Sequence, residues 1–320
     1  MPLRFRYTLH QLRILRAVVE HGGITRAAEA LHLTQPTVSM QIRQLNEAMG
    51  VTLFEPTGRE LRLTPAGSEA LAFATSILHS AELLSERLAA LEGVERGRLR
   101  LSAASTAEYF IPRLIGEFQQ AHPGVAVELK VASRATVVAR LREDADDLYV
   151  MAQPPSEEPV VASAFVDNPL VAIAPAAHVL ARMRRITLTE LVRHEFVLRE
   201  PGAGTRLLTD SFFSAQGLSL RTRLELGSNE AVKQAVIGGL GLAVISLHAL
   251  RDELLHHDRI RILDVQGLPI RSRWHSVRRA DRVPSRVVQS FTAFLAAQAP
   301  RLADDLAQSL PRARSNRRRN

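Results

Sequence analysis

Residues 23–39 read Gly23-Ile24-Thr25-Arg26-Ala27-Ala28-Glu29-Ala30-Leu31-His32-Leu33-Thr34-Gln35-Pro36-Thr37-Val38-Ser39, and this stretch decides the fold of the N-terminal part of the chain. In its first half, small or apolar side chains recur at helical spacing, at Ala27, Ala28 and Leu31. Thr25 or Gly23 is placed to cap that helix. Thr34 can cap a second helix, and Pro36 lies in its first turn, where a missing N–H costs nothing. The sequence therefore predicts two short helices joined by a tight turn.

The second helix is predicted to run from about residue 35 to residue 49. One of its faces is apolar and repeats at helical spacing through Val38, Ile42, Leu45 and Met49. The opposite face carries short polar side chains, a methionine and an arginine: Gln35, Thr37, Ser39, Met40, Arg43 and Gln44. Such side chains can read base edges and reach phosphates, so this helix is suited to a DNA major groove. The alternative is an ordinary helical hairpin.

The flanking segments favour DNA binding over the plain hairpin. An amphipathic helix precedes the pair and closes a three-helix core through Leu9, Leu12, Ile14, Leu15 and Val18. After the pair, residues 53–64 alternate as a two-stranded hairpin with Gly58 and Arg59 at its tip and Arg62 in its second strand. Arginines on such a wing typically contact the phosphate backbone or the minor groove.

Residues 9–67 resemble the winged helix-turn-helix of the LysR-type transcriptional regulators. The matching pieces are Thr25-Arg26-Ala27-Ala28, Leu33-Thr34-Gln35-Pro36-Thr37-Val38-Ser39, Ile42-Arg43-Gln44-Leu45, Gly50-Val51-Thr52-Leu53-Phe54 and Leu63-Thr64-Pro65-Ala66-Gly67. The resemblance implies that the DNA-contacting residues are Thr25, Arg26, Gln35, Pro36, Thr37, Ser39, Met40 and Arg43, with Arg59 and Arg62 at the backbone. One position departs from the family, because Glu55 stands where an arginine usually follows the phenylalanine. A carboxylate there repels phosphate, so we expect a weaker wing contact.

A long helix is predicted from Thr64-Pro65 to about residue 91. Its apolar positions lie seven apart, with a second set four residues on: Ala70, Ile77, Leu84 and Leu91, with Ala74, Ala81 and Leu88. Such a seam needs a partner, which is either the helix's own domain or a second copy. The family resemblance implies a homodimer, or a dimer of dimers, through Ala70, Ile77, Ala81, Leu84, Leu88 and Leu91.

The rest of the chain reads as alternating strands and helices, with a mostly parallel sheet. Strands are expected at residues 99–103, 125–131, 147–151, 170–174, 196–198, 222–226, 242–245 and 273–277, and helices at 105–120, 136–143 and 285–297. The predicted fold is multidomain α+β, in which a two-lobed α/β domain resembles a periplasmic-binding-protein clamp. The predicted boundaries are 1–65 for the winged helix, 66–92 for the linker helix, 93–97 for a glycine hinge, 98–300 for the effector domain and 301–320 for a basic disordered tail. Within the effector domain, lobe I is 98–163 with 268–300, and lobe II is 164–267.

Four predicted helices begin with residues suited to an anion, at the carboxyl ends of strands. The candidate effector-binding residues in these segments are Ser105, Thr106, Arg134, Thr136, Gly202, Gly204, Thr205, Arg206, Asn229 and Glu230. Each alone is better explained by helix capping, but four on one cleft favour an anionic metabolite.

Further stretches narrow the resemblance to the CbbR-like branch of the family, which regulates Calvin-cycle operons and RuBisCO genes. They are residues 198–206, residues 226–236, Ile245-Ser246-Leu247-His248, Trp274-His275 and Gln153-Pro154-Pro155, and they add Gln153 to the effector-binding candidates. The resemblance implies that the effector is either a phosphorylated intermediate, such as a sugar phosphate or phosphoenolpyruvate, or NADPH.

Composition excludes several other classes. The net charge is +8, of which residues 1–65 carry +3 and residues 301–320 carry +4. The basic N-terminal module suits DNA, and the tail is either a solvated end or a non-specific DNA contact. With no cysteine, no signal peptide and no apolar run near the ~20 residues of a membrane span, we expect a cytoplasmic protein without membrane contact.

No hydrolase, metalloprotease or nucleotide-binding motif is present, so the sequence predicts no enzyme, no cofactor and no catalytic or metal-binding residue. We therefore expect a regulator that binds double-stranded promoter DNA, senses an anionic metabolite and affects RNA polymerase at a carbon-fixation operon. The alternatives are a LysR-type regulator of an unrelated operon with a carboxylate effector, or a small-molecule-binding protein without a DNA-binding role.

Overall fold

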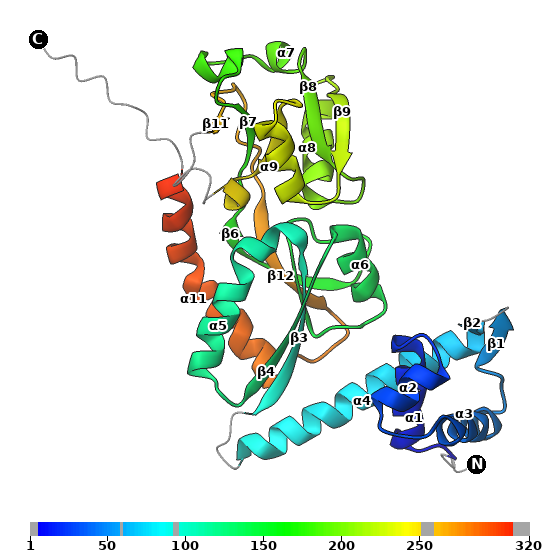
Figure 1. Ribbon diagram of the computed structural model, residues 1–320. Coiled ribbons are helices and arrows are strands. Elements are labelled where there is room, and N and C mark those ends of the chain that lie inside the picture. Colours follow the sequence, from blue (N-terminus) through cyan, green and yellow to red (C-terminus); the bar gives the residue numbers. More distant parts are fainter. Residues whose placement is uncertain (1–5, 58–59, 92–95, 251–258, 310–320) are drawn as a thin grey trace, which may run out of the picture. The chain divides into compact units, whose positions relative to one another are not determined.

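The computed structural model describes residues 6–57, 60–91, 96–250 and 259–309, and the chain divides into two compact units, Met1–Val94 and Glu95–Asn320 (Figure 1). The first unit opens with three helices, α1 (Leu9–Glu20), α2 (Ile24–Ala30) and α3 (Gln35–Met49). Thr8 caps α1 in a reciprocal capping box with Gln11, and Thr34 accepts from the Thr37 amide at the start of α3. The turn between α2 and α3 passes through His32, whose φ is +55°. Thr25 does not cap α2, whose N-cap is Gly23.

A two-stranded wing follows the helices. Strands β1 (Phe54–Thr57) and β2 (Glu60–Leu63) pair antiparallel, with Glu55 opposite Arg62. Thr64 ends the wing by donating to the Thr52 carbonyl, and its hydroxyl accepts from the Gly67 amide in the first turn of α4 (Pro65–Leu91). Gly67 is required there, since a Cβ would lie 2.0 Å from the Leu53 carbonyl oxygen. The predicted wing tip at Gly58 and Arg59 lies outside the described residues.

The apolar seam of α4 is buried in one part and exposed in another. Ala70, Ala74 and Leu78 are buried in the core of the first unit. We expected Ala70 to contact a second copy of the chain, and its burial contradicts that expectation. Farther along, Leu84 and Leu88 are 58% and 54% exposed. The heptad spacing alone could not separate these two halves, because both have the same period. The side chain of Leu91 lies outside the described part of the chain.

Lobe I of the second unit is built on a five-stranded sheet with the order β4-β3-β5-β12-β6. The strands are β3 (Gly97–Ala104), β4 (Val125–Ala132), β5 (Leu148–Met151), β6 (Val160–Asp167) and β12 (Arg273–Arg279). Helices α5 (Ile111–Ala121) and α11 (Arg286–Ser309) cover one face, and α6 (Arg134–Arg142) lies on the other (Figure 1).

Lobe I differs from expectation in four respects. The sheet is mixed, because β12 runs antiparallel to β5 and β6. The predicted lobe boundary at residue 163 falls inside β6, which stays in this sheet to Asp167. The helix expected at 105–120 is broken into a 3-10 turn, η1 (Ser105–Tyr109), followed by α5, with Pro112 in the first turn of α5. Gly97, expected in the hinge, opens β3, and hinge residues 93–95 lie outside the described ranges.

Lobe II contains two strand groups joined by a parallel bridge between Phe196 and Leu242. In one, β7 (Leu170–Pro175) lies between β10 (Ala243–Ser246) and β11 (Ile260–Ile262), antiparallel to both. In the other, β8 (Glu195–Arg199) pairs parallel with β9 (Arg221–Leu226). The helical elements of this lobe are η2 (Val179–Arg182), α7 (Leu188–Leu191), α8 (Gly204–Ala215), α9 (Asn229–Ile237) and the 3-10 turn η3 (Leu247–Leu250). Ile270 packs in the core of this lobe, so the second boundary also lies beyond the expected residue 267.

The C-terminal helix corrects the predicted tail. α11 continues to Ser309, so residues 301–309 are helical and not disordered, and residues 310–320 lie outside the described part. Leu302 and Leu306 are buried against the second unit, and two ion pairs tie the helix to α5, Arg113–Asp305 at 2.9 Å and Arg301–Glu117 at 2.6 Å. Apolar burial at two positions one turn apart is what orders this end of the chain.

One hydrophobic core runs through both lobes. At their junction, Phe110 from lobe I packs against Trp274 and against His248 of η3, with ring centroids 5.4 and 5.0 Å apart. None of the helices in the described part of the chain is long and apolar enough to cross a membrane.

Candidate functional sites

The polar face of α3 is presented as the sequence predicted. Val38, Ile42 and Leu45 are buried, which turns Gln35, Pro36, Met40 and Arg43 outward, with Thr37 and Ser39 half-buried beside them. Gln35 donates from Nε2 to the Ser39 hydroxyl at 3.1 Å, which holds the two side chains together on the exposed surface. This face carries donors and acceptors of the kind that read base edges.

The other DNA-binding candidates lie around α3. Thr25 and Arg26 are exposed on α2, and the Arg26 guanidinium donates to the Gly22 carbonyl at 2.6 Å. Arg62 is exposed on β2, directly across the wing from Glu55. Arg59 lies outside the described residues.

The effector-binding candidates fall into two groups in the second unit. The first group surrounds Arg199, at the end of β8, which is only 3% exposed. Its guanidinium donates to Asn229 at 2.7 Å, to the Ser105 hydroxyl at 3.2 Å and to both oxygens of Glu200. Asn229 in turn donates to the Thr106 hydroxyl at 3.0 Å. The network therefore joins η1 of lobe I to β8 and α9 of lobe II.

The second group surrounds Arg134, the first residue of α6. Its Nε donates to the Gln153 carbonyl at 2.9 Å, and Ser133 caps the helix by accepting from the Thr136 amide. The glycine loop of lobe II lies against it: the Ala135 amide donates to the Gly202 carbonyl at 3.2 Å, and a Cβ on Gly204 would lie 3.7 Å from the Arg134 Cδ. The structure thus brings together Arg134, Thr136, Gln153, Gly202 and Gly204.

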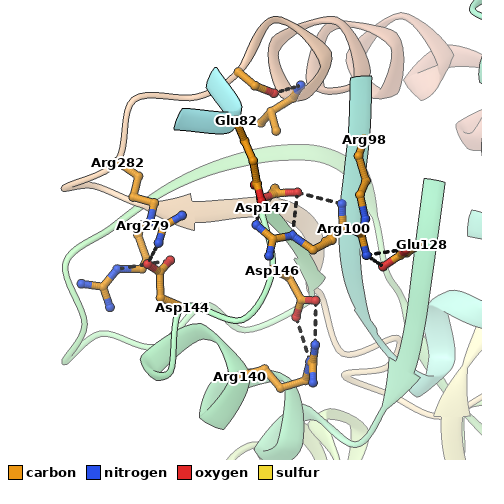
Figure 2. Close-up of polar contacts among 12 residues, drawn as sticks. Glu82, Arg98, Arg100, Glu128, Arg140, Asp144, Asp146, Asp147, Arg279 and Arg282 are labelled. Atoms are coloured by element: carbon orange, nitrogen blue, oxygen red, sulfur yellow. Dashed lines mark hydrogen bonds and ion pairs between the residues drawn. The ribbon is translucent and has the colours of Figure 1, made fainter. Parts of the chain in front are cut away.

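Arg134 differs electrostatically from its neighbours. Burial is the main cause that lowers its pKa, and the Arg142 charge adds to that effect. No carboxylate within the described ranges forms an ion pair with Arg134. Other lobe I arginines are paired, for example Arg100 with Asp147 at 2.7 Å and Arg140 with Asp146 at 2.8 Å (Figure 2). A half-buried cation without a counter-ion is suited to an anionic ligand.

Three candidates are engaged elsewhere. Arg206 pairs with Asp210 and Glu225, each at 2.7 Å, so its charge is compensated within lobe II. Thr205 is buried, and its carbonyl accepts from Thr209. Glu230 pairs with Lys233. A cavity of about 30 Å³ beneath the end of α11 has room for about one water molecule, so it is not the metabolite site.

Sequence reasoning missed two buried cations of this region, Arg199 and Lys233. Arg199 directly follows the apolar strand residues Phe196, Val197 and Leu198, a charged residue at a carboxyl strand end, and that signal could have found it. Lys233 is one of only two lysines in the chain and lies on the buried face of α9. Its burial follows from tertiary packing alone, so no signal in the sequence could have found it.

A helix-turn-helix with a wing, followed by a two-lobed α/β domain, defines a DNA-binding regulator with a ligand-binding domain. Residues 9–68 match the model of the bacterial regulatory helix-turn-helix protein, lysR family, and residues 92–300 match the LysR substrate binding domain. The chain belongs to the LysR family of transcriptional regulators. The predicted family and fold class are confirmed.

Individual relatives agree. The chain is 45% identical over 288 residues to a RuBisCO operon transcriptional regulator of Acidithiobacillus ferrooxidans, covering 90% of this chain and 93% of the relative. The regulatory domain of Synechocystis PCC6803 CcmR, solved in complex with 2-PG, is 41% identical with a TM-score of 0.61, covering 65% of this chain and all of that one. Full-length CbnR, solved with its target DNA, shares the fold at 21% identity with a TM-score of 0.62, covering 91% of this chain and all of CbnR.

Proposed function

We propose that this regulator controls a carbon-fixation operon from the cytoplasm in response to a phosphorylated metabolite. The observation that carries the proposal is Arg134, a half-buried cation with no acidic partner in the described part of the chain, at the start of α6 and against the glycine loop. The similarity to a RuBisCO operon regulator and to a CcmR domain bound to 2-PG, which we read as 2-phosphoglycolate, supports both the operon and the ligand class.

The ligand would take its charge contacts from Arg134 and its orientation from the Ser133 and Thr136 hydroxyls, which lie 3.0 Å apart at the start of α6. A helix N-terminus and a guanidinium together favour a dianionic phosphate over a neutral ligand. The Arg199 network connects the two lobes beside this site and does not bind the ligand itself, because the guanidinium already donates to Asn229, Ser105 and Glu200.

Isothermal titration calorimetry with 2-phosphoglycolate, phosphoenolpyruvate, a sugar phosphate, NADPH and glycolate tests the ligand class. We expect a phosphorylated ligand to bind the full-length protein and Arg134→Gln to weaken it about tenfold or more, the loss of one charge-assisted contact. Arg98→Gln is the matched control, because it removes an exposed lobe I arginine of β3 that pairs with Glu128 of β4. Tighter binding of glycolate than of every phosphorylated probe would instead identify a carboxylate sensor.

On the DNA side we propose that α3 reads the operator in the major groove. We also propose that the chain acts as a dimer or dimer of dimers through the exposed part of α4, including Leu84 and Leu88.

Gln35→Ala or Ser39→Ala should cost roughly 1–3 kcal/mol of binding free energy on the cognate site and little on random DNA. Arg62→Ala should weaken binding to the cognate site and to random DNA by the same factor. Footprinting of the intergenic region beside a RuBisCO operon, with and without the phosphorylated ligand, tests the operon assignment and any effect on RNA polymerase.

A further inference from the structure

A second buried cation lies beside the Arg199 network. Lys233 on α9 has a side chain only 4% exposed, and its Nζ lies 2.8 Å from the Oε2 of Glu230, whose side chain is 58% exposed. The same Nζ lies 5.2 Å from the ring centroid of Tyr109 in η1. Lys233 thus belongs to lobe II but contacts η1 of lobe I, the 3-10 turn that also contains Ser105 and Thr106.

The charges of this region act on one another. The pKa of Glu108, on η1, is raised chiefly by burial and further by Glu230, while Arg199 and Lys233 oppose the shift. Together with Glu200 on Arg199, the cluster holds three carboxylates and two cations. An anion that entered with all three carboxylates charged and in place would meet a net negative environment, so its binding is favoured when one carboxylate withdraws or is protonated.

Glu230 is the carboxylate best placed to withdraw. Glu200 makes two hydrogen bonds to Arg199 and is 29% exposed, whereas the Glu230 side chain is twice as exposed. Glu230 can therefore turn into water more readily than Glu200, because its side chain already lies largely in solvent and recovers its hydration there. Lys233 cannot follow it, since its Nζ is enclosed by the protein.

We propose that Lys233 is an anion-binding residue of the effector site and that Glu230 is its displaceable counter-ion, whose place on the ammonium the acidic group of the effector takes. This inference rests on the proposed function and adds the residue that selects for ligand charge. In the empty protein Glu230 compensates a buried ammonium that would otherwise be costly. In the complex an acidic group of the effector replaces the Glu230 carboxylate, and Tyr109 carries the contact to lobe I.

The test is calorimetric titration of 2-phosphoglycolate into full-length wild type, Glu230→Gln and Lys233→Gln. Glu230→Gln removes the competing charge and keeps the shape, so we expect binding at least about threefold tighter, together with a lower melting temperature of the unliganded protein. Lys233→Gln should weaken binding about tenfold or more. Glu190→Gln is the matched control, because Glu190 makes an ion pair of the same i,i+3 spacing with Arg193 on the surface of lobe II, at 2.9 Å.

The outcomes separate the two proposals. Unchanged or weaker binding by a folded Glu230→Gln protein, while Arg134→Gln still loses affinity, would overturn the role of Glu230 and leave the phosphorylated effector in place. Failure of wild type to bind any phosphorylated probe would overturn both. Because Lys233 is buried and its variant can fail to fold, the decision rests on Glu230→Gln, whose side chain lies at the surface.

Discussion

At the residue scale, Glu55 lies directly across the wing from Arg62 and both side chains are exposed. Opposite charges at such a cross-strand position attract, so the carboxylate of Glu55 lowers the positive potential of the wing around Arg62. Glu55→Arg should therefore tighten promoter binding and steepen the dependence of log K on log salt by about one to two units. Fluorescence anisotropy over a salt series checks this, with Glu55→Gln expected to lie between. An unchanged salt slope would place this part of the wing away from the DNA.

Gly67 carries a second residue-scale prediction. A methyl group there would meet the Leu53 carbonyl at 2.0 Å, so Gly67→Ala should destabilise the first unit by roughly 1–3 kcal/mol or more as the wing is pushed off α4. Gly116→Ala is the control, because a Cβ at that position of α5 meets nothing within 4 Å and should stabilise by ~0.5–1 kcal/mol. Thermal unfolding followed by circular dichroism measures both. If Gly67→Ala and wild type melted at the same temperature, the wing would be shown to shift away from the added methyl group without loss of stability.

The exposed face of α3 was easier to predict from the sequence than the surroundings of the effector-binding candidates. Gln35, Ser39 and Arg43 lie on a helix whose apolar stripe fixes which way they point, so period alone places them. Arg206 and Arg199 occur seven residues apart in one motif, and only the fold shows that the first pairs with Asp210 and Glu225 while the second joins the lobes. Side-chain direction at strand ends and in loops depends on long-range packing, which a single sequence does not carry.

At the element scale, α11 and β6 show why the remaining expectations failed. The arginine-rich composition after residue 309 suggested disorder for the whole end of the chain, yet Leu302 and Leu306 provide enough apolar surface to hold another two turns of helix. In β6, residues 161–164 are exposed and do not alternate, so no period-2 signal was present. The strand exists because it pairs with β12 over its whole length.

The end of α11 gives an element-scale prediction. A chain that ends at Pro300 loses Leu302, Leu306 and the ion pairs to α5, and should unfold at a lower temperature than a chain that ends at Ser309. Loss of one buried leucine costs about 2–5 kcal/mol, so Leu302→Ala in the full chain should reproduce much of the effect. Leu207→Ala, at an exposed position of α8, should cost much less. Identical melting temperatures for the two truncated chains would mean that this part of the helix does not stabilise the second unit.

At the scale of the whole molecule, we expect the buried His248 at the junction of the lobes to make stability depend on pH. It contacts Phe110 of lobe I, its Nε2 lies 3.0 Å from the Asp167 carbonyl, and burial lowers its pKa to about 4. A histidine that is harder to protonate when folded stabilises the fold fully above its unfolded pKa of about 6.5, and this stability is lost as the pH falls toward 4, by up to about 3 kcal/mol. Urea unfolding between pH 7 and pH 4.5 should show a smaller acid loss in His248→Gln than in wild type. Parallel pH profiles would exclude His248 as the cause.

The whole molecule must also obey linkage between its two units. If the phosphorylated ligand changes promoter affinity by some factor, promoter DNA must change ligand affinity by the same factor. Calorimetry of 2-phosphoglycolate with free protein and with a protein–promoter complex checks this. Equal ligand affinity in both, together with a ligand-dependent footprint, would contradict equilibrium coupling.

The burial of Trp274 against Phe110 and His248 has a practical consequence. It is the single tryptophan of the chain, and it lies where the two lobes meet. Light that excites indole selectively therefore reports on one position, without a label and without emission from any other tryptophan. A rearrangement of the lobes would change the polarity and quenching around that ring, so the native protein contains its own optical reporter of any movement between the lobes.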